Sequence, residues 1–207
     1  MRHLFLLAAL FCACISYAQI RVQERLPKSK TGFALTTAKT RAKIYYDVND
    51  ALVIKRSAEL FARDIQMVTG QKPELIQKRE RAKALVIVGT IEKNQWICEL
   101  AQKGKIDIRP LQGAWERYLI QTVDNPSPGV AKALVIAGSD RRGAAYGLFS
   151  ISEMMGVSPW YWWGDVPVKT HKALYVDAPP TYSKTPSVKY RGIFLNDEAV
   201  SYTHLTL

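Results

Sequence analysis

The sequence predicts an α/β domain over residues 19–156, in which helices pack on a mixed β-sheet. Two observations lead to this prediction. Apolar runs at 84–90 and 133–139 are continuous, as expected of strands buried on both faces. A segment with apolar residues at helical spacing follows each of these runs. Buried strands that alternate with helices are typical of layered α/β domains.

The first half of this domain is expected to hold two short strands and one long helix. Strands are predicted at 33–36 and 44–46, where β-branched and aromatic residues gather. A helix is predicted from about residue 50 to 69, because apolar residues recur at steps of three and four, and Gly70 supplies a stop. Its buried stripe is formed by Ile54, Ala58, Phe61, Ile65 and Val68.

The strand at 84–90 leads into a second helix. Thr90 is expected to cap that helix, because a hydroxyl at this position can accept a hydrogen bond from a free backbone N–H. Its inward face would carry Trp96, Ile97 and Leu100. Cys98 is interpreted as a small buried hydrophobe, since the sequence offers no histidine to activate its thiol.

The second half is expected to form a hairpin and a third helix. A strand at 118–123 is followed by a Pro- and Gly-containing turn at 125–129 and by the strand at 133–139. Ser139 or Asp140 is expected to cap a helix that runs to about Met155. The stretch 138–143 lacks the spacing of a phosphate-binding loop, so capping explains its residues better than phosphate binding does.

The two ends of the chain differ from the domain between them. Residues 1–18 combine a basic tip, an apolar stretch and a small-x-small site, which predicts a signal peptide cleaved after Ala18 and a secreted or periplasmic protein. No later run reaches the roughly 20 apolar residues of a membrane span. Residues 199–207 carry no Asp, Glu, Lys or Arg, and we expect an atypical tail on a truncated chain.

Charge and residue counts exclude several classes of function. The 29 Lys and Arg against 18 Asp and Glu give a net charge of +11, which would attract an anionic partner. The basic residues are scattered and do not alternate with aromatic ones, which disfavours a nucleic-acid binder. Acidic sugars are the more natural anionic partner of an exported protein, and a basic solvated surface without a specific partner is the alternative interpretation. His171 is expected to be solvated, and no cluster with metal-ligand spacing occurs, so neither a metal nor a cofactor is predicted.

Residues 157–186 are rich in Pro and aromatic residues, and they are expected to form an extended interdomain linker. At its centre stand Trp160, Trp162 and Trp163. Flat aromatic faces suit the apolar faces of sugar rings, and large rings between two domains also seal interfaces. The sequence therefore leaves two interpretations of these tryptophans: a sugar-binding platform or a domain seal.

A further strand is predicted over 187–198, where a strand-like run at 188–195 ends in Ile193, Phe194 and Leu195 and is followed by polar residues. Asn196, Asp197 and Glu198 are candidate substrate-binding residues, because polar side chains after a barrel strand face the active-site mouth. A helix cap after the strand is the alternative interpretation.

Two motifs carry a family resemblance. The strand and helix at 133–156 resemble the end of the small α/β domain that precedes the barrel in several glycoside hydrolases, including hexosaminidases and family 67 glucuronidases. The more specific motifs are VSPWYWWGDVP at 157–167 and SVKYRGIFLNDE at 187–198. They resemble glycoside hydrolase family 115, the xylan α-1,2-glucuronidases.

The resemblance implies a (β/α)₈ catalytic barrel whose first strand is 187–198. It also implies inverting removal of glucuronic acid, often 4-O-methylated, from glucuronoxylan. The general acid and base would lie on later strands, so no catalytic residue is expected here; Asn196 and Asp197 would contact the sugar. The alternatives are a non-catalytic module that binds acidic glycans, or a hexosaminidase-like or family 67-like hydrolase. The oligomeric state stays open, with a dimer among the alternatives.

Overall fold

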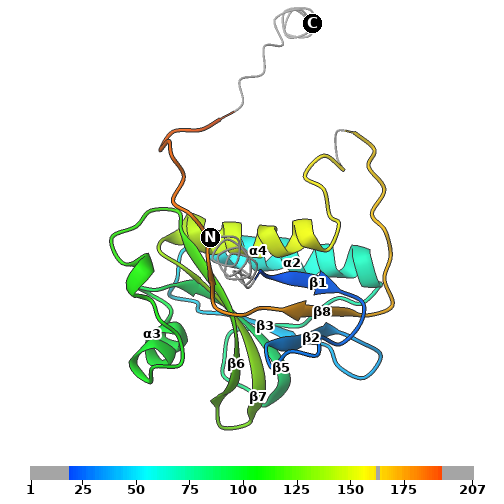
Figure 1. Ribbon diagram of the computed structural model, residues 1–207, viewed down its shortest axis with the longest axis horizontal. Helices are drawn as coiled ribbons and strands as arrows, with labels where there is room; N and C mark the ends of the chain where they lie inside the picture. Colours follow the sequence, from blue (N-terminus) through cyan, green and yellow to red (C-terminus); the bar gives the residue numbers. More distant parts are fainter. Residues whose placement is uncertain (1–18, 162–163, 193–207) are drawn as a thin grey trace, which may run out of the picture.

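The computed structural model describes residues 19–161 and 164–192, and it has the predicted layered α/β architecture (Figure 1). The elements in chain order are β1 (Arg21–Gln23), β2 (Gly32–Thr36), β3 (Lys43–Tyr46), α2 (Leu52–Thr69), β4 (Leu75–Ile76), β5 (Ala82–Thr90), α3 (Gln95–Gln102), the 3-10 helix η1 (Arg109–Leu111), β6 (Tyr118–Ser127), β7 (Val130–Gly138), α4 (Arg141–Met154), β8 (Leu174–Asp177) and β9 (Thr181–Tyr182).

The strands form two sheets. The larger sheet has six strands in the order β4-β3-β5-β7-β6-β9. Its first four strands are parallel, whereas β6 and β9 run antiparallel to their neighbours, so the sheet is mixed as predicted. The smaller sheet is antiparallel, with β8 between β1 and β2.

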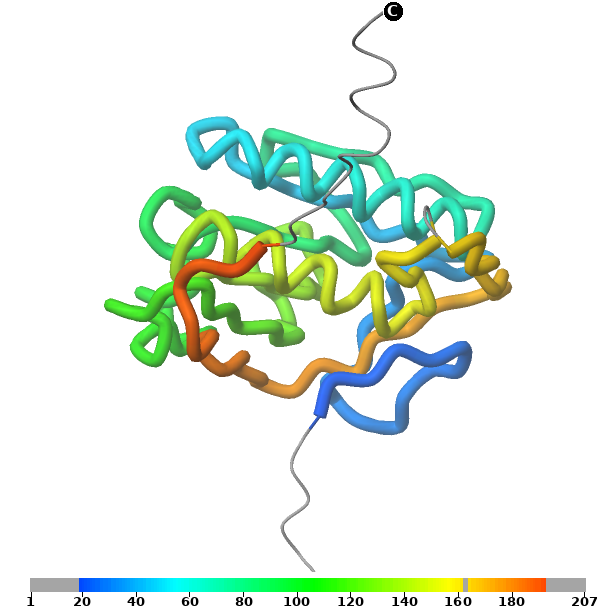
Figure 2. The backbone as a smooth tube through the Cα atoms, turned by 90° about the horizontal axis from the view of Figure 1, so that it is seen from above, coloured from blue at the N-terminus to red at the C-terminus, as the bar shows by residue number. Residues whose placement is uncertain are grey.

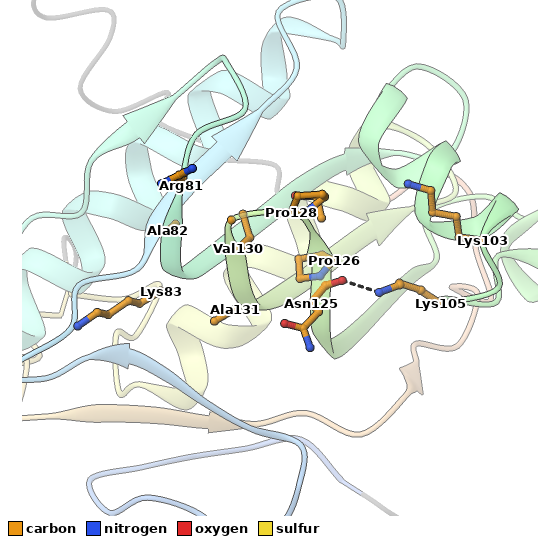
Figure 3. A pocket seen from close by; sticks show the side chains of 12 residues that line it. Arg81, Ala82, Lys83, Lys103, Lys105, Asn125, Pro126, Pro128, Val130 and Ala131 are labelled. Carbon is orange, nitrogen blue, oxygen red and sulfur yellow. Dashed lines mark hydrogen bonds between the residues drawn. The ribbon is translucent and has the colours of Figure 1, made fainter.

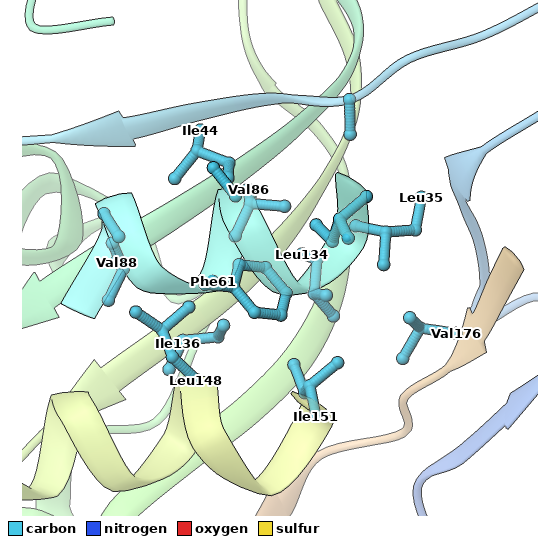
Figure 4. Close-up of a cluster of buried hydrophobic side chains, with 14 of the residues drawn as sticks. Leu35, Ile44, Phe61, Val86, Val88, Leu134, Ile136, Leu148, Ile151 and Val176 are labelled. Carbon is cyan, nitrogen blue, oxygen red and sulfur yellow. The ribbon is translucent and has the colours of Figure 1, made fainter. Parts of the chain in front are cut away.

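Both faces of the six-stranded sheet are covered, which explains its continuous apolar strands. On β5, Val86 and Val88 point into the cluster formed with α2 and α4, while Leu85 and Ile87 point into the cluster formed with α3. Side chains alternate across a strand, so a strand covered on both faces needs apolar residues at every position. Phe61 of α2 lies within the first cluster (Figure 4).

The two long helices follow their sequence signals closely. All five predicted stripe residues of α2 are fully buried, and Gly70 ends the helix with a φ of 71°. Such a left-handed conformation favours glycine. Asp140, rather than Ser139, caps α4: its carboxylate accepts hydrogen bonds from the backbone N–H groups of Arg142 (2.9 Å) and Gly143 (2.8 Å).

The predicted cap of α3 is wrong. Asn94 caps this helix by accepting a hydrogen bond from the Ile97 N–H (3.1 Å), while its side-chain amide donates to the Val88 carbonyl (3.0 Å). Thr90 precedes the turn before the helix; its hydroxyl accepts a hydrogen bond from the Lys93 N–H of that turn (3.2 Å) and donates one to Asp50 (3.0 Å). Cys98 is only half-buried, and its thiol donates to a backbone carbonyl.

The hairpin between β6 and β7 is longer than predicted. Strand β6 continues to Ser127, and the chain reverses at residues 128 and 129, where Gly129 has a φ of 85°. An irregularity between Asp124 and Ser127 shifts the strand register, and Asn125 adopts a φ of 47° there. The Pro and Asn residues that predicted a wide turn therefore lie partly in a bulged strand.

The prediction of an interdomain linker over 157–186 is wrong for residues 174–182, which form strands of the α/β domain itself. Strand β8 lies between β1 and β2, and β9 pairs with β6 at the edge of the larger sheet. Leu174 and Val176 are buried in the same cluster as α2 and α4. Local patterns did not reveal these short strands, because their partners lie far away along the chain.

Several predicted segments lie outside the described residues: the signal peptide 1–18, Trp162 and Trp163, the residues from 193 to 198, and the tail 199–207. Of the strand expected over 187–198, residues 187–192 are described, and they form no strand. In the described ranges, no helix is both long enough and apolar enough to span a membrane.

Candidate functional site

A groove of about 440 Å³ runs along the outer side of α2 and α4. We call it the α2–α4 groove; its lining is Leu60, Arg63, Asp64, Tyr118, Tyr146, Phe149, Ser150, Ser152, Glu153, Val157, Ser158, Pro159 and Tyr161. Leu60, Tyr146 and Phe149 are large apolar side chains that remain partly exposed there. An apolar surface rimmed by polar groups is typical of a contact site.

Asp64 is the buried charged group of this groove. Its side chain accepts a hydrogen bond from the Ser152 hydroxyl (2.7 Å), which ties α2 to α4. Burial raises the pKa of the Asp64 carboxyl, and the Ser152 hydroxyl and the nearby Arg63 offset this only in part. Asp64 is 6% exposed, so a substrate could hardly reach it. Its geometry therefore fits a link between helices rather than a catalytic acid.

Asp64→Asn is expected to raise the free energy of unfolding at neutral pH. The folded pKa of Asp64 lies above its unfolded value of about 3.8, so native stability is lost as the pH rises from the unfolded toward the folded pKa. Asparagine does not titrate, and its side-chain oxygen can accept the same hydrogen bond. Urea unfolding at a series of pH values should show that the free energy of unfolding of the variant, relative to that of the wild type, increases as the pH rises.

Ser152→Ala provides the matched control. Removing the hydroxyl leaves Asp64 buried without this donor, so the free energy of unfolding should fall by about 1 kcal/mol. If the wild type and Asp64→Asn showed the same pH profile, the assigned effect of burial on Asp64 would be wrong.

A second polar cluster surrounds Glu116, a buried residue with a φ of 53°. Its carboxylate binds Arg142 at the start of α4 (2.9 Å) and Arg191 near the end of the described chain. Hydrogen bonding by Arg191, and then by Arg142, lowers the pKa of Glu116. Arg191 also lies over the Trp115 ring, 5.8 Å from its centroid. These contacts hold residues 187–192 against the N-terminal end of α4 (Figure 2).

Sequence reasoning missed the Glu116 cluster entirely. Glu116 and Arg191 are 75 positions apart, and the motif at 187–198 that contains Arg191 does not indicate its partner. A lone acidic residue in a loop gives no sign that it will be buried with two arginines.

Trp160 is the one member of the predicted tryptophan trio among the described residues, and it is 60% exposed. Its neighbour Tyr161 lines the α2–α4 groove and accepts a hydrogen bond from Arg63 (3.1 Å). The choice between sugar platform and domain seal stays open, since Trp162 and Trp163 fall outside the described ranges. The same holds for the substrate-binding role predicted for Asn196, Asp197 and Glu198.

The remaining polar candidates have structural contacts. His171 is not fully solvated as expected, because its Nδ1 lies 2.6 Å from a carboxylate oxygen of Glu24 and its side chain is largely buried. Within the described ranges, no group of three or more His, Cys, Asp or Glu residues could hold a metal ion. At 138–143, Asp140 is occupied as a helix cap, and Gly143 packs against the Arg117 backbone.

Comparisons with known proteins point to glycoside hydrolases. No family model matches the chain, and no curated protein matches it. A solved family GH115 4-O-methyl-α-glucuronidase with specificity for decorated arabinogalactans is similar, with 32% identity, a TM-score of 0.64 and coverage of 80% of this chain and 20% of that one.

Two further solved structures are more distant. A GH84 protein has a TM-score of 0.46 at 11% identity, covering 78% of this chain and 22% of its own. The GH20 β-N-acetylhexosaminidase from Streptomyces coelicolor A3(2) has a TM-score of 0.40 at 13% identity, covering 82% and 25%. Neither likeness is close enough to support an argument. The chain spans about a fifth of the length of the GH115 enzyme, and its domain has a GH115-like fold.

Proposed function

We propose that this chain is part of an exported GH115 α-glucuronidase that removes glucuronic acid, or its 4-O-methyl ether, from glucuronoxylan side chains. The observation that carries the proposal is the likeness to a GH115 glucuronidase, at 32% identity over a shared fold. The motifs at 157–167 and 187–198 resemble the same family and support it independently of the fold.

In this proposal the described domain supports the chemistry and does not perform it. Inverting hydrolysis needs two carboxyl groups roughly 6.5–9.5 Å apart with room for a water molecule. The buried carboxyls Asp47, Asp64 and Glu116 all accept hydrogen bonds from this domain's own groups. We therefore place the general acid and base outside the described residues 19–161 and 164–192.

The proposed substrate is defined by its uronic acid. The similar solved enzyme is specific for decorated arabinogalactans, whereas the sequence motifs favour xylan. Both interpretations share a terminal glucuronic acid or 4-O-methylglucuronic acid as the group removed. We take glucuronoxylan as the first substrate to test, and arabinogalactan as the competing one.

The test compares the 207-residue chain with the product of its complete gene. The gene product is expected to release uronic acid from glucuronoxylan, with the β-anomer formed first in NMR spectra because the reaction inverts. The 207-residue chain is expected to release none. Turnover by the 207-residue chain would overturn the supporting role, and release of hexosamine by the gene product would overturn the family proposal.

Export is tested separately. If the proposed signal peptide is cleaved after Ala18, the exported protein should begin at Gln19 when its N-terminus is sequenced. An intact N-terminus in the cytoplasm would contradict this part of the proposal.

A further inference from the structure

A groove of the described domain lies at the end of the six-stranded sheet where the parallel strands β5 and β7 begin, around the turn of the β6–β7 hairpin. It has a volume of about 750 Å³. We call it the hairpin groove, and four of its lining residues are basic: Arg81, Lys83, Lys103 and Lys105. Its lining includes no Asp or Glu, and none of the four cations forms an ion pair within the described ranges.

The fold brings these cations together from two separate parts of the chain. Arg81 and Lys83 flank the first residue of β5, which pairs in register with Val130 of β7 just after the hairpin turn. Lys103 and Lys105 follow the end of α3 and approach the hairpin from its other side (Figure 3). The four positive charges therefore flank the turn of one hairpin.

One of the cations, Lys105, is held by the hairpin backbone, and the side chain of Arg81 passes close to the hairpin turn. Lys105 donates a hydrogen bond to the Asn125 carbonyl, which the dashed line in Figure 3 marks. The Arg81 side chain crosses Gly129 so closely that a Cβ added there would lie 2.9 Å from its Cγ. Cations that are already ordered lose less conformational entropy when they bind an anion.

The chemistry of the groove fits carboxylates carried on sugar rings. Ammonium and guanidinium groups form strong, charge-assisted hydrogen bonds with carboxylates. Between them, the exposed side chains of Pro128 and Ala131 offer a small apolar surface for the C–H face of a pyranose ring, whereas Pro126 and Val130 are buried beneath it. The lining has no aromatic ring on which nucleic-acid bases could stack, so single-stranded nucleic acid fits it less well.

We propose that the hairpin groove is a non-catalytic binding site for an anionic polysaccharide, and that it recognises uronate carboxylates along the glycan chain. The choice of a glycan as the anion rests on the proposed function; the choice of an anion rests on the charges of the groove alone. Such a site would keep the polymer near the enzyme independently of the active site.

The test measures binding of the 207-residue chain to glucuronoxylan, to unsubstituted xylan and to a single-stranded oligonucleotide. Binding to glucuronoxylan is expected, with weakening as salt is raised, because exposed charges are screened. Unsubstituted xylan should bind much more weakly. Equal binding of the two xylans, or tighter binding of the oligonucleotide, would overturn the assignment to uronates.

Two double variants locate the site. Lys103→Gln together with Lys105→Gln is expected to weaken glucuronoxylan binding about tenfold, which corresponds to about 1.4 kcal/mol. Lys55→Gln together with Lys93→Gln removes the same charge at the opposite edge of the sheet, outside the groove, and should leave binding almost unchanged. Matching thermal unfolding curves would show that both variants fold.

The outcomes separate this proposal from the enzymatic one. If the two double variants bind equally, the groove is not the binding site. If the Lys103 and Lys105 variant alone loses binding while the complete gene product releases no uronic acid, the groove assignment stands and the proposed enzymatic function fails.

Discussion

Phe61→Ala is expected to lower the free energy of unfolding by about 3–5 kcal/mol, the range for truncating a buried phenylalanine. Phe61 is fully buried on α2, in the same cluster as Val86 of β5 and Leu134 of β7 (Figure 4). Its removal leaves a cavity between the helix layer and the sheet, which neighbouring side chains fill only in part. Urea unfolding followed by circular dichroism measures the loss.

Phe149→Ala is the matched control, since it removes the same atoms from the other long helix of this layer. Phe149 is 37% exposed and lines the α2–α4 groove. Its truncation is expected to cost about 1 kcal/mol or less. Equal losses for the two variants would contradict the position of the core between α2, α4 and the sheet.

Gly143→Ala is expected to destabilise the fold by about 2 kcal/mol, within the usual range for overpacking. An added Cβ would lie 2.2 Å from the backbone oxygen of Arg117, which also accepts a hydrogen bond from the Ser139 N–H (2.8 Å). A backbone oxygen cannot rotate away as a side chain can. In an exposed helix the same change would raise the free energy of unfolding by about 1 kcal/mol, because alanine has a higher helix propensity than glycine. At Gly143 the clash with the Arg117 oxygen outweighs this gain.

Gly192→Ala shows the effect of the same substitution without the contact. No heavy atom of the described residues lies within 4 Å of a Cβ added at Gly192, and the expected change in unfolding free energy is within about 0.5 kcal/mol. A Gly143→Ala variant as stable as the wild type would show that α4 does not pack against the Arg117 backbone as described. Thermal unfolding of the two variants gives the comparison.

Elements with strong local patterns could be predicted from the sequence. Helix α2 was predicted because its stripe of five apolar residues repeats at helical spacing, and β5 because an apolar run of that length needs cover on both faces. Strands β8 and β9 were not predicted. Strand β1 pairs with β8, and the paired residues Arg21 and Asp177 lie at opposite ends of the domain sequence. A short stretch of sequence therefore never contains both partners.

The same limit applies to the candidate sites. The sequence shows its basic residues as scattered, and only the fold places Lys103 and Lys105 beside the hairpin that Arg81 also touches. Glu116 is buried because Arg142 and Arg191 reach it from distant parts of the chain. The sequence gives the charge of each side chain, whereas the neighbours of that charge are set by the tertiary structure.

By itself, the sequence determined the α/β class, the two long helices, the doubly buried strands and the resemblance to a family, because each is recorded in neighbouring residues. Only the tertiary structure decided the cap of α3, the second sheet, the buried Asp64–Ser152 link and the basic hairpin groove. These features depend on pairings across tens of residues or more, which form when the helices and strands pack and exclude water.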